Sequence, residues 1–354
     1  MPTHEGLPMR VHLVAVQAAM TLADYLSAES FAARIDALCA RAAQGLDGAA
    51  KLFAFPEAIG FPLLLALGAE GRPARAGHET AHETAYAAAR ALLLRERRGV
   101  LAAALRHRTG PLGALYLTRA KEAYLAYRAA FSAAARRYQA TIVAGSIFLP
   151  QLEEEASRGL YVTSPQVFNT AFTFSPSGRL LDRTTKSYLT PAELRARLRG
   201  GSPAGVHTFE TPLGRVGVAI CLDAFYGSVM DRLDGLGARV VVQPSANHAP
   251  WQRAWPADPR HSEESAWFSY GLRAGLQDRL YLQYGVNPML VGAVYDLEPR
   301  GRSSIVANTR FHDTALHDAA LEGYPGLLAV AESDDEEEVV CATVELAPRW
   351  TGPG

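Results

Sequence analysis

Residues 11–16 (VHLVAV) are the stretch that decides the fold, because five of the six positions are apolar and three are valine. Such a run is typical of a β-strand that is covered on both faces. Outward along the chain, residues 27–45 show the apolar spacing of a helix, and residues 51–55 (KLFAF) form a second buried strand that ends at Pro56. The sequence therefore begins with a β-α-β unit, whose crossover is right-handed in nearly all proteins.

The remaining signals extend this pattern into one layered domain. Residues 68–139 are rich in alanine and arginine and carry no strand signal, and Gly99 and Gly110 divide them into about three helices. Residues 332–338 (ESDDEEE) are expected to form a solvated turn rather than a cation site, because adjacent like charges repel each other. We predict a single α/β domain over residues 1–354, with about two sheets and helices outside them. Further strands are predicted at residues 141–144, 171–174, 215–220, 239–243, 281–284, 304–307 and 339–344, and further helices at residues 224–236 and 265–278.

Composition and charge argue against several classes of protein. The formal net charge is -1 over 354 residues, so no overall field recruits nucleic acid or a membrane surface. No stretch reaches the ~20 apolar residues of a membrane span, and the first ten residues lack the apolar core of a signal peptide. Three cysteines are too few for a disulfide framework, and the ten histidines show no ligand spacing. We expect a cytoplasmic protein without a metal site.

Three reactive side chains each follow predicted strand structure: Glu57 follows the strand at 51–55, Lys186 follows a strand-turn-strand at about 171–185, and Cys221 follows the strand at 215–220. Open α/β sheets place their sites at such strand ends. Taken singly, each residue has an ordinary explanation as a helix cap, a surface charge or a small core residue. Cys221 also lies where a strand meets a helix, and there backbone amides and a nearby cation are expected to lower the pKa of a thiol. The three side chains taken together indicate that Cys221 is a nucleophile. The other two cysteines, Cys39 and Cys341, are expected in the core.

The sequence blocks around these residues resemble the nitrilase superfamily of carbon–nitrogen hydrolases, and they occur in the order of that family. The three principal blocks are residues 51–60 (KLFAFPEAIG), 183–189 (RTTKSYL) and 216–225 (VGVAICLDAF). Supporting blocks are residues 10–17 (RVHLVAVQ), 169–178 (NTAFTFSPSG), 241–246 (VVQPSA), 273–287 (RAGLQDRLYLQYGVN) and 302–306 (RSSIV).

The resemblance implies a four-layer α-β-β-α sandwich in which Glu57, Lys186 and Cys221 meet at one end of the sheets. Glu57 would then act as general base and acid, and Cys221 would form a thioester with the acyl group. Lys186 and the backbone N–H of Leu222 would stabilise the oxyanion. No cofactor is implied.

Several further residues are candidates for the site. Glu193 matches a second glutamate of the family, but it also completes a helix-start signal, Thr190-Pro191-Ala192-Glu193, and both readings can hold together. Asp223 is interpreted as a carboxylate favoured by the dipole of the following helix. The possible substrate-pocket residues are Tyr188, Asn247, His248 and Trp251, with His248 read as a pocket wall or an exposed side chain rather than as a second base.

The substrate class is inferred from the residues after the nucleophile. Leu222 and Asp223 stand where true nitrilases of the superfamily usually carry Trp-Glu, which favours an amide, ω-amide or carbamoyl substrate. A nitrilase acting on a nitrile, and a non-catalytic binding protein on the same fold, remain the alternatives.

The interval between Glu57 and Lys186 is 129 residues (186 − 57), longer than the family usually has. We expect residues 68–118 to form an extra helical insertion that roofs the pocket or adds an oligomer contact, or else a surface addition without a role. The family resemblance also implies a homodimer or a higher homo-oligomer, formed through helices 224–236 and 265–278.

Overall fold

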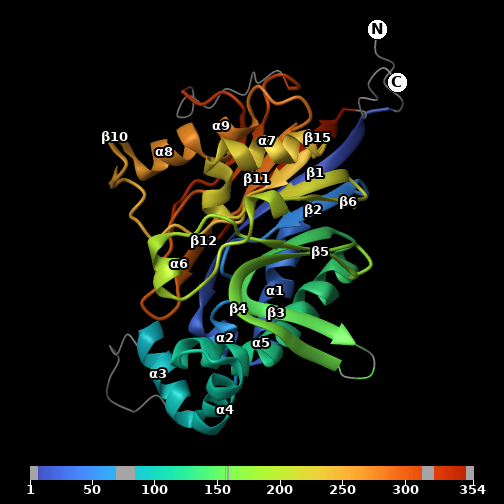
Figure 1. Cartoon of the computed structure of the whole chain (residues 1–354). Helices are drawn as coiled ribbons and strands as arrows, with labels where there is room; N and C mark the ends of the chain where they lie inside the picture. The colour runs from blue at the N-terminus through green and yellow to red at the C-terminus, as the bar shows by residue number, and fades with distance from the viewer. Residues whose placement is uncertain (1–6, 69–83, 156, 158, 313–322, 348–354) are drawn as a thin grey trace.

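The computed structural model describes residues 7–68, 84–155, 157, 159–312 and 323–347. Two β-sheets lie face to face between layers of helices, and a group of helices projects from one end of the body (Figure 1). The first sheet contains β1 (Met9–Thr21), β2 (Ala50–Ala54), β3 (Thr141–Glu155), β4 (Gly159–Phe174), β5 (Leu180–Thr185), β12 (Leu290–Ala293) and β15 (Glu338–Leu346). The second contains β6 (Thr208–Thr211), β7 (Gly214–Val218), β8 (Val240–Val242), β11 (Tyr284–Asn287), β13 (Ser304–Ala307) and β14 (Leu327–Val330), and β9 (Ala254–Trp255) pairs with β10 (Asp258–Ser262).

The helical elements lie mostly outside the two sheets. They are η1 (Leu22–Tyr25), α1 (Ala28–Ala42), α2 (Leu63–Ala66), α3 (Ala85–Arg95), α4 (Arg97–His107), α5 (Pro111–Tyr138), α6 (Pro191–Arg195), η2 (Pro203–Gly205), η3 (Cys221–Phe225), α7 (Gly227–Gly235), α8 (Glu263–Tyr270) and α9 (Leu272–Leu276). No helix in the described part of the chain is long and apolar enough to cross a membrane.

Parallel pairing at the centre of each sheet brings several strand ends to one edge. In the first sheet β2 lies parallel to both β1 and β3, and in the second sheet β8 lies parallel to both β7 and β11. The segments that follow β2, β7 and β8 therefore leave the sheets in positions where loops can form a shared site.

The alternation along β1 explains why its sequence is almost continuously apolar. Leu13 and Ala15 pack with strands of the second sheet in the core between the sheets, whereas Val14 and Val16 pack against α1 and α5 on the other face. A third apolar cluster joins the outer face of the second sheet to α7 and α9, for example through Leu233. The predicted four-layer α-β-β-α architecture is confirmed.

Residues 84–139, the described part of the alanine-rich region, form the predicted three helices, but one boundary differs. The break lies at Glu96, and Gly99 is inside α4. A Cβ at Gly99 would lie 3.2 Å from Thr118 Cγ2 of α5, so this glycine serves the close approach of two helices rather than a turn. Pro111 begins α5, as the Gly110-Pro111 signal predicts. Residues 69–83 of the expected insertion lie outside the described residues.

Three other sequence predictions require correction. The predicted helix at 265–278 is two short helices, α8 and α9, joined at Gly271, and the helix expected from 224 begins at Gly227 after the turn η3. Cys341 is exposed rather than in the core, because the buried positions of β15 are those on its other face, including Val340 and Val344. The strands β6, β12 and β14 have four residues each, and none of them was predicted from the sequence.

Candidate active site

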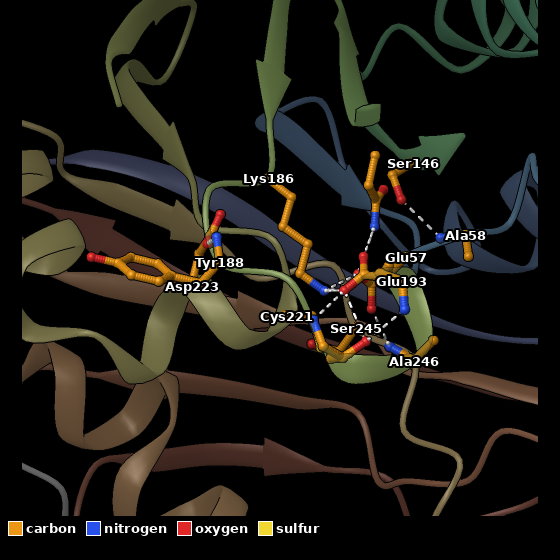
Figure 2. Close-up of polar contacts among 12 residues, drawn as sticks. Glu57, Ala58, Ser146, Lys186, Tyr188, Glu193, Cys221, Asp223, Ser245 and Ala246 are labelled. Carbon is orange, nitrogen blue, oxygen red and sulfur yellow. Dashed lines mark hydrogen bonds and ion pairs between the residues drawn. The ribbon is translucent and has the colours of Figure 1, made fainter. Parts of the chain in front are cut away.

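The side chains of Glu57, Lys186 and Cys221 come together at the edge where β2, β5 and β7 end (Figure 2). Lys186 Nζ lies 2.7 Å from Glu57 Oε1. The thiol of Cys221 interacts with the carboxylate of Glu57. When the thiol is ionised, the charge on its sulfur also interacts with Lys186. All three residues are buried. Side chains that are 129 and 164 positions (186 − 57 and 221 − 57) apart in the chain thus form one cluster.

The turn after β2 fixes the carboxylate of Glu57. Ala58 has a positive φ of 58°, and its N–H donates to Ser146 Oγ on β3 at 2.8 Å. Gly145 makes room for the turn, since a Cβ there would lie 2.0 Å from the carbonyl oxygen of Pro56. From the opposite side, the N–H of Ala246 donates to Glu57 Oε2 at 3.2 Å. The first sheet therefore holds the turn that carries Glu57, and the loop after β8 of the second sheet binds its carboxylate.

Cys221 lies in a strained turn. Its φ is 50°, which is unfavourable for a residue with a side chain. Two hydrogen bonds hold this conformation: the Cys221 N–H donates to the carbonyl of Pro244 at 2.8 Å, and Gln243 Nε2 donates to the Cys221 carbonyl at 2.8 Å. Both partners directly follow β8, so the neighbouring parallel strand determines where the thiol points.

Asp223 links the cysteine turn to the loop that carries Lys186. Its carboxylate accepts hydrogen bonds from the N–H groups of Ser187, at 3.0 and 3.1 Å, and of Tyr188, at 2.7 Å. Burial raises the pKa of Asp223 to about 6, although the two backbone donors oppose that shift. The sequence interpretation, a helix-dipole carboxylate, is corrected: Asp223 stands in the short turn η3 and joins two loops of the site.

Glu193 is both a helix cap and a partner of Lys186. It forms a capping box with Thr190 at the start of α6, and its Oε2 lies 2.9 Å from Lys186 Nζ. Asn169 of β4 joins the two carboxylates, because its Nδ2 donates to Glu57 and to Glu193, each at 2.8 Å. Asn169 was given no role from its sequence, although an amide among the apolar residues of a strand indicates a side chain that needs a polar partner.

The charges of the cluster are set by burial and by mutual contact. Burial alone would lower the pKa of Lys186, but Glu57 and Glu193 outweigh it and the pKa is raised, so the amine is a cation. For Glu193, Lys186 and hydrogen bonds outweigh burial and lower the carboxyl pKa. Burial raises the pKa of Glu57, with a further contribution from Glu193. The resulting cluster holds one buried cation between two carboxyl groups.

The pKa of the Cys221 thiol shifts in the direction opposite to the prediction. Burial and the charge of Glu57 raise its pKa well above the usual value, and Lys186 offsets this only in part. The expected lowering by a helix N-terminus does not occur, because Cys221 begins a short turn and the next helix starts six positions later, at Gly227 (227 − 221). Cys221 therefore rests as a neutral thiol beside a carboxylate that can accept its proton.

A cavity of about 900 Å³ opens onto this cluster, and Glu57, Lys186, Glu193, Cys221 and Leu222 all line it. Of the four predicted pocket residues, Asn247 and His248 line the cavity and Tyr188 and Trp251 do not. The ring of Tyr188 points away from the cluster (Figure 2) and stacks on Tyr226 at a centroid distance of 3.5 Å.

Trp251 is 1% exposed and packs in the core under α8, against Trp267 and Phe268. An aromatic residue in a loop after a strand carries no sequence signal of whether it faces a cavity or the core. Among the described residues, no group of three or more His, Cys, Asp or Glu side chains could hold a metal ion.

Comparison with known proteins gives one family match and many structural ones. A family model described as carbon-nitrogen hydrolase matches residues 13–263. Similar solved structures include a carbon-nitrogen hydrolase from Helicobacter pylori G27, with a TM-score of 0.59 and 16% identity over 96% of this chain and 89% of that one. Nit3 of Saccharomyces cerevisiae, of branch 10 of the nitrilase superfamily, has a TM-score of 0.55 and 15% identity over 95% and 90% of the two chains.

An amidase from Nesterenkonia sp. AN1 is also similar, with a TM-score of 0.54 and 15% identity over 95% of this chain and 93% of that one. One mutant of that amidase carries the acetamide moiety of fluoroacetamide on its active-site cysteine. At these identities the likeness establishes the fold. No curated protein sequence matches the chain.

Proposed function

The chain belongs to the carbon–nitrogen hydrolase family, and on that premise we propose that it hydrolyses a non-peptide amide or carbamoyl bond through a thioester on Cys221. The observation that carries this proposal is the cluster of Glu57, Lys186 and Cys221 at the wall of a single cavity. A neutral thiol beside a buried carboxylate, with a cation 2.7 Å from that carboxylate, supplies a nucleophile, a base and an electrostatic partner for an oxyanion.

In the first half of the reaction, Glu57 takes the proton from the Cys221 thiol as the sulfur attacks the carbonyl carbon. The carbonyl electron pair moves onto oxygen, where Lys186 Nζ and the N–H of Leu222 stabilise the negative charge. Glu57 then donates its proton to the nitrogen, the carbon–nitrogen bond breaks, and ammonia or an amine leaves with the acyl group bound to sulfur.

In the second half, a water molecule occupies the space that the amine left. Glu57 takes a proton from this water, the oxygen attacks the thioester carbon, and the carbon–sulfur bond breaks. The sulfur recovers a proton from Glu57 and the carboxylic acid is released. A base that becomes an acid within each half-reaction works best with a pKa raised toward neutral pH, which is the direction that burial gives Glu57.

The amide assignment rests on the residues after the nucleophile and on one relative. Leu222 and Asp223 replace the Trp-Glu that nitrilases usually carry, and Asp223 here joins the loop of Lys186 to the cysteine turn. The cysteine adduct of the Nesterenkonia amidase also supports an amide-type substrate.

Mass spectrometry combined with product analysis tests the proposal. With primary amides, we expect equal amounts of ammonia and carboxylic acid, and an acyl adduct on Cys221 in acid-quenched protein. Cys221→Ala should show neither product nor adduct, whereas Cys341→Ala, a change at an exposed cysteine, should behave as the wild type. Turnover of nitriles alone would assign the nitrilase reaction instead, and binding without any turnover or adduct would favour a non-catalytic protein.

The pH dependence of kcat/KM is expected to have an acid limb set by Glu57. Glu57 must be ionised to accept the thiol proton, and burial raises its pKa above the usual 4.5, so activity should fall as the pH drops through a value above 4.5. Because the charge of Glu193 contributes to this raised pKa, Glu193→Gln should move the limb to lower pH. The exposed Glu29→Gln change should leave the limb in place, and an unmoved limb in Glu193→Gln would contradict the assignment.

A further inference from the structure

The cavity beside Cys221 has a wall that the hydrolysis of a small amide does not need. Apart from the catalytic cluster, most of the side chains that line it are apolar, among them Phe61, Phe148, Leu290, Val294 and Leu297. Phe61 and Phe148 pack against each other at a centroid distance of 4.7 Å. These residues belong to the first-sheet side of the chain, from the segment after β2, from β3, and from β12 and the turn that follows it.

Helix α3 completes this wall. Ala85, its first residue, lines the cavity, and the Ala85 N–H donates to Asp296 Oδ1 at 2.8 Å. Asp296 lies in a tight turn that Val294 and Leu297 close through two backbone hydrogen bonds, each of 3.1 Å. The start of α3 is thus attached to the turn whose side chains form the apolar wall, and part of the 68–118 segment contributes to the cavity.

The charged residues that line the cavity away from the cluster have a different origin. Arg195 belongs to α6, Arg253 belongs to the segment between β8 and α8, and Glu263 is the first residue of α8. Chain segments on the first-sheet side therefore supply an apolar surface. The charged groups come from α6 and the second-sheet side, where apolar side chains such as Phe225, Trp255 and Trp267 also line the cavity. A ligand that fills such a space has an extended apolar part.

The volume points to a substrate larger than a simple amide. A cavity of about 900 Å³ is near the upper end of the range, roughly 300–1,000 Å³, that holds drug-sized ligands. A short-chain amide would leave most of the apolar wall without a partner and would gain little from its burial.

We propose that the substrates of this enzyme are primary amides of extended apolar acids, with the acyl group lying against Phe61, Phe148, Val294 and Leu297 and ending near Ala85. This inference rests on the proposed function, because it places the carbonyl carbon at Cys221. The acyl group, rather than the amine, is placed against the apolar wall, because the acyl group stays bound to sulfur through both half-reactions. The amine must instead leave so that water can enter.

A series of straight-chain primary amides, from propanamide to octanamide, tests the proposal by ammonia release. Each added methylene that is buried should raise kcat/KM about fourfold, the equivalent of about 0.8 kcal/mol. Over five methylenes, the ratio of octanamide to propanamide should reach roughly 10²–10³.

Two substitutions at the wall should shift the preferred chain length in opposite directions. Ala85→Phe places a ring in the cavity and should lower the ratio at least tenfold, whereas Leu297→Ala lengthens the space and should move the optimum to longer chains. Ala87→Phe is the matched control, because Ala87 is an exposed residue of the same helix that does not line the cavity, and it should keep the wild-type ratio. If Ala85→Phe fails to fold, Leu297→Ala still decides the question.

The outcomes separate this inference from the proposed function. Turnover of propanamide with no dependence on chain length would overturn the inference and leave the proposed hydrolysis standing. A gain with N-alkyl acetamides instead of longer acyl chains would overturn the assignment of the wall to the acyl group. No turnover of any amide or carbamoyl compound would overturn the proposed function and the inference with it.

Discussion

Replacement of Glu57 by glutamine is expected to lower kcat/KM by about 10²–10⁴-fold, the usual contribution of a positioned acid–base group. Glutamine has nearly the same shape but cannot accept the thiol proton. The loss is severe here because burial raises the pKa of Cys221, so that few molecules carry a thiolate without a neighbouring base. Acylation and deacylation should both slow, which rapid-quench kinetics can measure separately.

Glu29→Gln serves as the matched control for this change, because Glu29 is an exposed glutamate in the first turn of α1. It should retain wild-type kinetics, and Glu57→Gln should retain the wild-type circular dichroism spectrum. The acid limb of the pH profile should disappear from any residual activity of Glu57→Gln. More than about one per cent of wild-type activity, with the limb intact, would show that another group accepts the proton.

Replacement of Lys186 by methionine should damage stability and catalysis together. Lys186 is 1% exposed and lies 2.7 Å from Glu57 and 2.9 Å from Glu193. Removing the cation leaves two carboxyl groups buried beside each other, and breaking a buried pair in this way costs about 3–5 kcal/mol. The loss of one oxyanion partner should in addition lower kcat by about 10²–10³-fold. Urea unfolding and steady-state kinetics measure the two effects.

A double variant separates the two roles of Lys186. In Lys186→Met with Glu193→Gln, one of the two carboxylates is neutral, so unfolding free energy should be partly recovered while kcat stays low. Lys121→Met, at an exposed position of α5, should change stability by no more than about 0.5 kcal/mol. A double variant no more stable than Lys186→Met alone would show that repulsion between the carboxyl groups is not the cause of the instability.

The sequence by itself determined the layers of the fold and the candidates for the site. The continuous apolar run of residues 11–16 requires two covered faces, and β1 has the core between the sheets on one face and α1 and α5 on the other. Glu57, Lys186 and Cys221 could be selected because each follows a strand, and strand ends can be recognised from local composition. Capping at Thr190 and Glu193 was likewise a local pattern, and it is present.

Tertiary structure alone decided what those residues face and how they are charged. Whether Trp251 meets the cavity or the core, and whether Cys341 is buried, depends on segments far away in the chain. Asn169 joins Glu57 and Glu193 only because β4 passes between them. The thiol pKa of Cys221 was expected to fall and instead rises, because removal from water exceeds the effect of Lys186. Burial and long-range contact are properties of the assembled chain, and no local stretch of sequence carries them.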